Sequence, residues 1–240
     1  TAATATATAA ARPTKQPTAT SQKELPEAAL EVLEDAMPVV LAIRSLPEVE
    51  IEPGLLNREE LAAYLLDAIL EDYPPLEQAM DNIEWNLLGI LAPGEDILEL
   101  QLEMLGEDIL GFYDQDEKTM FVIDGGDTGP GLLKFVLTHE YVHVLQDAAF
   151  DLGAIDDAIG TDNFDASTAF SALVEGDATL AGVVAFFEVV TQKELTAFLT
   201  DSTGTPSLTP SRARTFLEEL LGFSYIAGQA FVERLIQVGG

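Results

Sequence analysis

Apolar residues recur at helical spacing through most of the chain beyond residue 23. In ELPEAALEVLEDA and in NREELAAYLLDAILEDY they recur every three or four positions, which predicts one amphipathic helix in each segment. Asn57 is the predicted N-cap of the second helix, because Glu60 lies three residues on and completes a capping box. The same spacing predicts further helices over residues 75–91, 96–105, 193–199, 212–221 and 226–238.

Three short segments have the pattern of β-strands instead. RSLPEVEIEP has proline boundaries and an alternation that predict a strand over residues 49–52. DILGFYDQ and KTMFVID are rich in aromatic and β-branched residues and are separated by acidic turn residues, which predicts a β-hairpin. The fold class that follows is α+β, predominantly helical, with a small antiparallel sheet.

One further helix, GLLKFVLTHEYVHVLQD, differs from the others because it is apolar on nearly every side. Such a helix is expected in the middle of a domain. Its polar residues need partners there, since burying two imidazoles and a carboxylate without them costs several kcal/mol. A metal ion is an efficient way to satisfy all three groups.

The composition limits the function classes that remain open. With 240 residues, 48% of them hydrophobic, the chain can bury a sizeable core. Its 42 acidic and 11 basic residues give a net charge of −31, which argues against nucleic acid or an anionic membrane surface as a partner. No apolar run of about 18 residues occurs, so no transmembrane segment is predicted. Cysteine is absent, so a zinc site would need nitrogen and oxygen ligands.

Residues 1–23 form a segment of their own, made almost entirely of Ala, Thr and Pro. This composition predicts a disordered leader or stalk. Stalks of this kind commonly tether exported domains, and the chain starts at Thr1 without an initiator Met, so we expect an extracellular or surface-tethered protein. The alternative is a flexible cytoplasmic tail.

The two histidines of the chain both fall in the apolar helix, as HEYVH. His139 and His143 lie four residues apart, so they share one helical face and can reach a single ion. Glu140 is displaced by about a quarter turn, which places it beside the ion. In this HExxH arrangement the carboxylate takes a proton from the water that the metal activates and passes it to the leaving amine. The alternative is a pair of core histidines whose hydrogen bonds are satisfied.

A catalytic zinc ion needs a third protein ligand and one open position for water. FSALVEGDATLAG places Glu175 and Asp177 among small and hydrophobic neighbours, 32 residues beyond His143. The two carboxylates point to nearly opposite sides of a helix, so only one can bind the metal. We assign Glu175, because Gly176 directly after it would let this helix and the HEYVH helix approach closely.

HEYVH followed by EGDA resembles the zincin superfamily of metallopeptidases, in the branch that uses Glu as third zinc ligand. The chain is similar in particular to a group of exported bacterial proteins that carry HEYVHxLQDxxFDL and LVEGDAT. The likeness runs from about residue 110 to the C-terminus, with specific motifs at 138–152 and 172–179. It implies that His139, His143 and Glu175 bind Zn²⁺ and that Glu140 is the catalytic base.

The resemblance also implies a layout for the chain. A zincin-like domain would cover residues 24–240, with a helical N-terminal part at 24–106, a metal-binding core at 107–240 and a helical C-terminal subdomain that carries the third ligand. GFYDQDEKTMFVID would supply the edge strand along which an extended peptide or protein substrate aligns. Relatives continue beyond Gly240, so the catalytic unit is expected to extend past this chain. Many Glu-type zincins carry Asp four residues after the ligand Glu to orient a histidine, whereas this chain has Thr179.

Four other residues receive supporting roles. Asp147, one turn past His143, either orients an imidazole or contacts solvent or a loop at the helix end. The same two alternatives apply to Asp177. Tyr225 is either the donor to the developing oxyanion or a core tyrosine. Arg44, in an apolar stretch, is predicted to form an internal ion pair.

The function predicted from these features is zinc-dependent peptide-bond hydrolysis. One alternative is a catalytically inactive zincin-like domain that uses zinc for binding or stability, although an intact Glu140 argues against it. Another is a surface-displayed interaction module. The isolated charges within apolar helices argue against that, because a purely structural core normally excludes them.

Overall fold

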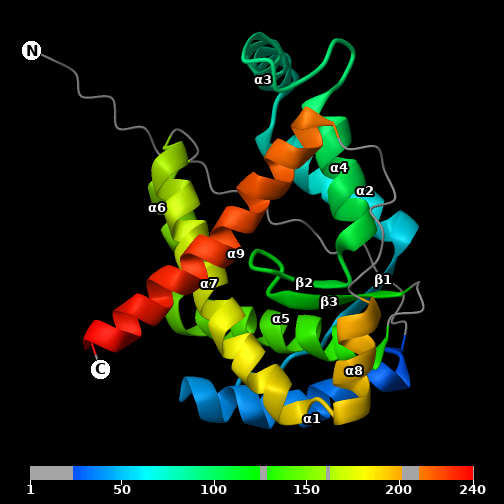
Figure 1. Ribbon diagram of the computed structural model, residues 1–240, viewed down its shortest axis with the longest axis vertical. Helices are drawn as coiled ribbons and strands as arrows, with labels where there is room; N and C mark the ends of the chain where they lie inside the picture. The colour runs from blue at the N-terminus through cyan, green and yellow to red at the C-terminus, as the bar shows by residue number, and fades with distance from the viewer. Residues whose placement is uncertain (1–23, 125–128, 161–162, 202–210, 240) are drawn as a thin grey trace, which may run out of the picture.

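The computed structural model describes residues 24–124, 129–160, 163–201 and 211–239, so the predicted leader at 1–23 lies outside the described residues. Figure 1 shows a predominantly helical protein with one small sheet, which confirms the α+β class. In chain order the elements are α1 (Glu27–Arg44), β1 (Gly54–Asn57), α2 (Arg58–Asp72), α3 (Pro75–Leu87), α4 (Ile97–Asp108), β2 (Gly111–Asp114), β3 (Thr119–Asp124), α5 (Pro130–Phe150), α6 (Leu152–Ile159), α7 (Phe164–Val189), α8 (Gln192–Asp201) and α9 (Arg212–Gly239).

The sheet is mixed, with strand order β1-β3-β2. β2 and β3 pair antiparallel, which confirms the predicted hairpin. β1 pairs parallel with β3, so the prediction of a purely antiparallel sheet is wrong. The strand predicted over residues 49–52 is also wrong, since β1 begins at Gly54. Leu55 and Leu56 are both buried, one in each of two core clusters, and a strand buried on both faces lacks the alternation on which the prediction relied.

Asn57 ends β1 and starts α2. Its side chain accepts a hydrogen bond from the Glu60 backbone N–H at 2.9 Å, and the Glu60 carboxylate accepts one from the Asn57 N–H at 2.8 Å. The predicted capping box is therefore confirmed, and it fixes the point where the chain turns from the sheet into the helix.

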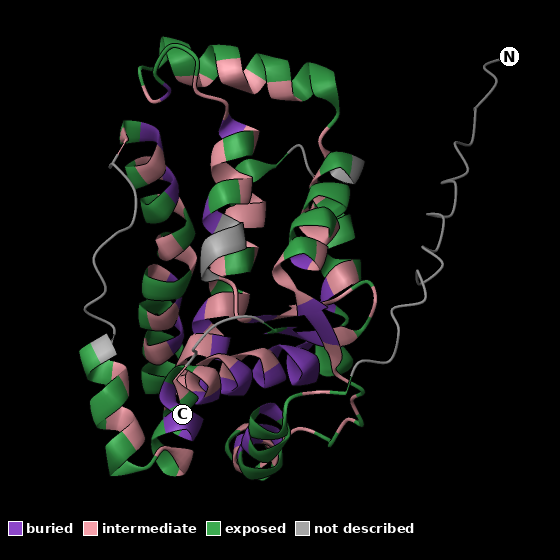
Figure 2. Cartoon of the chain, turned by 90° about the vertical axis from the view of Figure 1, so that its right-hand side faces the viewer, coloured by how far each residue is buried: buried purple, intermediate pink, exposed green. Residues whose placement is uncertain are grey.

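Helix α5 lies beneath the sheet at the centre of the hydrophobic core (Figure 1). Its residues Leu137, Tyr141 and Leu145 are 0%, 0% and 1% exposed, and they pack with buried residues of α1, β1, β3 and α7. Figure 2 shows buried positions gathered along this helix and the adjoining sheet. Helix α1 thus shares one core with α5 and α7, although the sequence assigns it to a separate N-terminal part.

Helices α7 and α9 cross with their backbones in direct contact. A Cβ at Gly176 would lie 2.0 Å from the carbonyl carbon of Gly228, and one at Gly228 would lie 1.9 Å from the carbonyl oxygen of Ala172. Gly176 therefore brings α7 against α9, whereas the prediction placed its close approach between the two helices that carry the metal ligands. The two helices predicted over 212–221 and 226–238 are one continuous helix, because packing against α7 outweighs the low helix propensity of its glycines.

Helix α7 is the one element of the described chain that is long and apolar enough to cross a membrane, judged by length and composition. It packs against α1, α5 and α9 and contributes to the core that surrounds α5. The core helix of a domain passes the same test. Two of its four carboxylates, Glu175 and Asp177, have partners on neighbouring helices.

Candidate metal centre

Helix α5 places both histidines on one face, as their spacing predicts. The Nε2 atoms of His139 and His143 are 3.0 Å apart, and the rings meet edge to face with their centroids 4.6 Å apart. Their side chains are 12% and 10% exposed. Two imidazole nitrogens therefore converge on one point at the inner edge of the core.

Helix α7 brings Glu175 to the same point. Its Oε2 lies 3.1 Å from His139 Nε2 and 3.4 Å from His143 Nε2. A Cβ at Gly182 of α7 would lie 3.1 Å from the His139 Cα, so this glycine lets α7 approach α5 closely. Of the two carboxylates in EGDA, the structure brings Glu175 to the histidines and turns Asp177 away from them.

The spacing of these three atoms fits a tetrahedral zinc site. Zinc bonds of about 2.0–2.1 Å at tetrahedral angles hold two ligand atoms about 3.3 Å apart. The three distances here are 3.0, 3.1 and 3.4 Å. Two imidazoles and one glutamate also form a ligand set of catalytic zinc sites, which keep the fourth position open.

The group carries two negative charges when both imidazoles are neutral and both carboxylates are ionised. Neither Glu140 nor Glu175 pairs with a lysine or arginine in the described part of the chain. Burial lowers the pKa of His143, but its hydrogen bond to Glu175 and the charges of both carboxylates outweigh burial and raise that pKa to about 9. Burial raises the pKa of Glu175, but its hydrogen bonds to both histidines prevail and lower it to about 2. The two carboxylates thus stabilise a positive charge on His143, and a bound cation would take the place of that proton.

Glu140 lies between the ligand group and the sheet. Its Oε2 accepts a hydrogen bond from the backbone N–H of Tyr113 in β2 at 2.9 Å. Burial raises the pKa of the Glu140 carboxyl above its ordinary value, against the lowering effect of His143 and His139. A carboxylate with a raised pKa accepts a proton more readily near neutral pH, which suits a general base.

Tyr225 of α9 reaches the group from the other side. Its ring centroid lies 5.8 Å from that of His139, with the planes 32° apart. Partial burial and the nearby carboxylates of Glu175 and Glu140 raise the pKa of Tyr225 above its ordinary value, so the phenol keeps its proton at neutral pH. The α7–α9 contact at Gly228, three residues along, holds Tyr225 at this place. Its role as oxyanion donor stays a prediction.

A pocket of about 290 Å³ opens between the first half of α7 and the middle of α9. Glu175 and Tyr225 line its inner end, so the pocket is continuous with the ligand group. The other lining side chains are hydroxyl-bearing or apolar, namely Phe164, Ser167, Thr168, Ser171, Leu220, Leu221 and Ser224. The pocket offers space for an uncharged part of a bound molecule.

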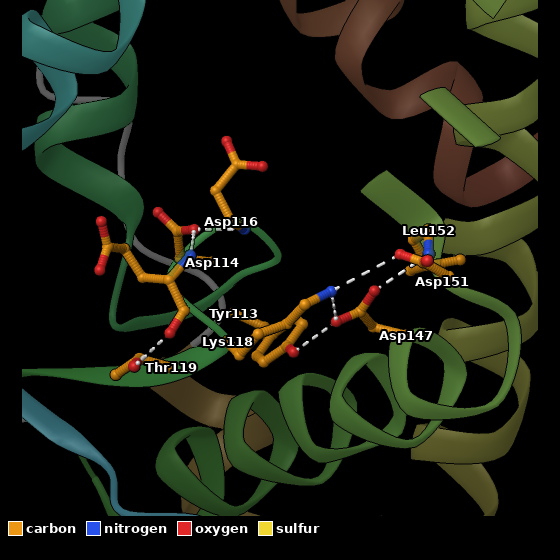
Figure 3. A network of polar contacts seen from close by, with 9 residues as sticks. Tyr113, Asp114, Asp116, Lys118, Thr119, Asp147, Asp151 and Leu152 are labelled. Atoms are coloured by element: carbon orange, nitrogen blue, oxygen red, sulfur yellow. Dashed lines mark hydrogen bonds and ion pairs between the residues drawn. The ribbon is translucent and has the colours of Figure 1, made fainter. Parts of the chain in front are cut away.

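Asp147 contacts neither imidazole, so of its two predicted roles the orientation of a histidine is wrong and the contact with a neighbouring loop at the helix end is confirmed. Its carboxylate accepts hydrogen bonds from the Tyr113 hydroxyl at 2.7 Å, the Lys118 ammonium at 2.6 Å and the Leu152 backbone N–H at 3.0 Å (Figure 3). Tyr113 and Lys118 belong to the hairpin region, which lies over this end of α5 (Figure 3). Asp147 therefore fastens β2 to α5, close to where Tyr113 meets Glu140.

Gln146 contacts His143 instead, and sequence reasoning missed it. Its Oε1 lies 2.8 Å from His143 Nδ1, and its Nε2 donates to the Val174 carbonyl and to Asp177. Asp177 in turn pairs with Arg44, which confirms the internal ion pair predicted for that arginine. The signal in the sequence was the position of Gln146, three residues after His143 and hence on the same helical face.

Comparison of the chain with protein-family models, with curated proteins and with solved structures found no match. The resemblance to zincins therefore rests on the motifs HEYVH and EGDA, and on the geometry of the group that they form. That geometry joins two helices, α5 and α7, at three atoms with the spacing of zinc ligands.

Proposed function

We propose that this protein is a zinc-dependent metallopeptidase in which His139, His143 and Glu175 bind the metal. The proposal is carried by the spacing of the three ligand atoms, 3.0 to 3.4 Å, with the Glu140 carboxylate beside them. Structural zinc sites have four protein ligands, whereas this group has three in the described chain. The fourth position would be left for water.

Zinc, when bound, acts as a Lewis acid and lowers the pKa of the water it holds to about 7. Glu140 then accepts a proton from the attacking water and delivers it to the leaving amine. Tyr225 donates its hydroxyl hydrogen to the oxygen on which negative charge develops. These steps use side chains that meet at the boundary of α5, α7 and α9.

The free edge of β2 would align the substrate. Among the described residues β2 pairs only with β3, and on its other side the Tyr113 N–H donates to Glu140. The hydrogen bond from Ile123 N–H to the Leu110 carbonyl, together with the register of the hairpin, turns the backbone groups of Gly111 and Tyr113 toward that other side. An extended peptide would pair there with the backbone of Gly111 and the carbonyl of Tyr113, with its scissile bond next to Glu140.

The test is elemental analysis of purified protein for zinc, in wild type, His143→Ala and Glu175→Ala. We expect near-stoichiometric zinc in wild type and loss of zinc in both variants, because each variant removes one of three ligands. A peptidase assay on peptides of mixed sequence then follows with the zinc-loaded wild type.

Each contrary outcome points to a different function. Zinc without hydrolysis would favour the inactive zincin-like domain, in which the metal serves binding or stability. A folded wild type that takes up no zinc would leave His139 and His143 as core residues and would refute the metallopeptidase proposal.

A further inference from the structure

The second ring nitrogen of His143 starts a chain of contacts that ends on helix α1. We propose that Gln146, Asp177 and Arg44 are positioning residues, which hold His143 in the tautomer and orientation that can bind the metal. The inference rests on the zinc site proposed above, although none of these three side chains lies in the ligand group. It gives α1, which carries no recognisable motif, a part in metal binding.

The partners of Gln146 determine which way its amide points. Its Nε2 lies 3.0 Å from the carbonyl oxygen of Val174 and 2.7 Å from Asp177 Oδ2. A carbonyl and a carboxylate only accept hydrogen bonds, so the amide nitrogen must face them. The amide oxygen is thereby left facing His143, with Oε1 at 2.8 Å from Nδ1.

An acceptor at that point determines the tautomer of His143. Because the amide oxygen has no hydrogen, Nδ1 must carry the ring hydrogen and donate it. The lone pair of the neutral ring then lies on Nε2, the atom 3.0 Å from His139 Nε2 and 3.4 Å from Glu175 Oε2. Metal-binding histidines are held in this way in general, through the hydrogen bond of their other nitrogen.

Arg44 holds the far end of this series of contacts. Its two terminal nitrogens donate to the two oxygens of Asp177 at 2.8 and 2.6 Å, and such bidentate pairs fix orientation as well as adding energy. Each side chain is 21% exposed, so the pair is partly shielded from water. Without a fixed Asp177, the Gln146 amide could turn its nitrogen toward His143. The ring hydrogen would then move to Nε2, the nitrogen needed by the metal.

Thr179 gives a second reason to assign this role to Asp177. Thr179 stands four residues after Glu175, and its hydroxyl is buried without a hydrogen-bond partner among the described residues. It therefore supports neither histidine. The orienting contact comes instead from Asp177, two residues after Glu175, and acts through Gln146.

The test compares zinc affinity, by competition with a chromogenic chelator, in wild type, Asp177→Asn and Gln146→Leu. We expect each variant to bind zinc about 10- to 100-fold more weakly, the usual cost of losing a partner of a ligand. The visible spectrum of the cobalt(II)-loaded protein should change in both, because it reports how the ligands are arranged. Gln146→Leu leaves the Arg44–Asp177 pair intact. A loss of zinc affinity in this variant would therefore come from the orientation of His143 and not from breaking that ion pair.

Glu194→Gln is the matched control. Glu194 of α8 pairs at 3.0 Å with Lys134 of α5, and the two side chains are 18% and 10% exposed. The control therefore removes a comparable ion pair on the same helix, away from the metal group. We expect a lower unfolding temperature, with zinc affinity and the cobalt spectrum unchanged.

A double variant tests rescue. Asp177→Asn combined with Gln146→Glu places a carboxylate next to His143 Nδ1 and an amide donor behind it. We expect it to bind zinc about tenfold more tightly than Asp177→Asn alone, since carboxylates are common partners of metal-binding histidines. A purely structural role of Asp177 predicts further loss, because the Val174 carbonyl would face a second acceptor.

The proposal is overturned if both single variants bind zinc within about twofold of wild type. It is also overturned if Glu194→Gln loses as much affinity as they do. Wild type that binds no zinc refutes the metal site and this inference together. Wild type that binds zinc but cleaves no peptide refutes hydrolysis alone, and the affinities still decide the role of Gln146 and Asp177.

Discussion

Helix α5 carries two groups of buried polar side chains, and they are satisfied in different ways. At its end, Asp147 accepts hydrogen bonds from a tyrosine, a lysine and a backbone N–H. About two turns earlier, Glu140 and the two imidazoles of α5 lie beside Glu175 of α7, and neither carboxylate has a lysine or arginine partner among the described residues. The hydrogen bonds and the charge of Asp147 are satisfied by protein atoms alone.

The difference separates a structural group from a candidate site. A buried carboxylate whose charge is matched by Lys118 needs nothing further. Two carboxylates beside two imidazoles leave negative charge that a divalent cation would neutralise. The first group should therefore matter for stability and not for metal binding, and the second for metal binding and chemistry.

The largest effect is expected from Glu140→Gln in the second group. The amide cannot accept the proton of the attacking water, so hydrolysis should fall by about 10²- to 10⁴-fold or become undetectable. Zinc content should stay at the wild-type level, because Glu140 lies outside the three-ligand group. Steady-state kinetics with parallel elemental analysis measures both. Hydrolysis at the wild-type rate would show that Glu140 is not the base.

Glu175→Ala should weaken metal binding, whereas Glu140→Gln blocks proton transfer. It removes one of three ligands, so zinc affinity should fall tenfold or more, roughly the loss seen on disturbing such sites. The measurement is zinc retained after dialysis against a chelator series. Asp177→Ala is not an adequate control here, because Asp177 contacts Gln146. Full retention of zinc would mean that another residue completes the site.

Asp147→Ala tests the first group, which we expect to contribute to stability and not to metal binding. It leaves the Tyr113 hydroxyl and the Leu152 N–H without their acceptor, which should lower the free energy of unfolding by about 1–3 kcal/mol. Urea titration followed by circular dichroism measures the loss. Zinc affinity should remain that of wild type, and a clear drop would contradict the division into two groups.

Tyr113→Phe should give the smallest change. It removes one hydrogen bond from Asp147 and keeps the ring and the backbone N–H that meets Glu140. The free energy of unfolding should fall by about 1 kcal/mol. Thermal unfolding of Tyr113→Phe, measured in parallel with Asp147→Ala, would detect this loss of stability. A loss larger than that of Asp147→Ala would mean that the ring itself is displaced.

The metal group was predictable because most of it is local. Four residues separate His139 from His143 on one helix, and helical geometry alone brings their rings together. Glu175 stands out as a carboxylate in an apolar segment, and that feature carries over to the structure. The hairpin and the Asn57 cap also depend on neighbouring residues only.

The remaining features depend on contacts between distant segments. Whether Asp147 or Gln146 meets His143 is decided by where the hairpin and α7 lie around α5, which the helix sequence does not contain. The parallel pairing of β1 depends on the chain returning to β3 after three helices. The continuity of α9 depends on its packing against α7, which it meets most closely at Gly228.

The contact between Arg44 and Asp177 spans 133 residues of sequence, and that between His139 and Glu175 spans 36. Closing loops of such length costs entropy that is recovered only when the distant surfaces pack. A partly folded chain would therefore hold zinc weakly. A folded chain that binds zinc gains stability in proportion to the logarithm of free zinc over its dissociation constant. If zinc binds as proposed, its scarcity would therefore also raise the fraction of unfolded chains that proteases can cleave.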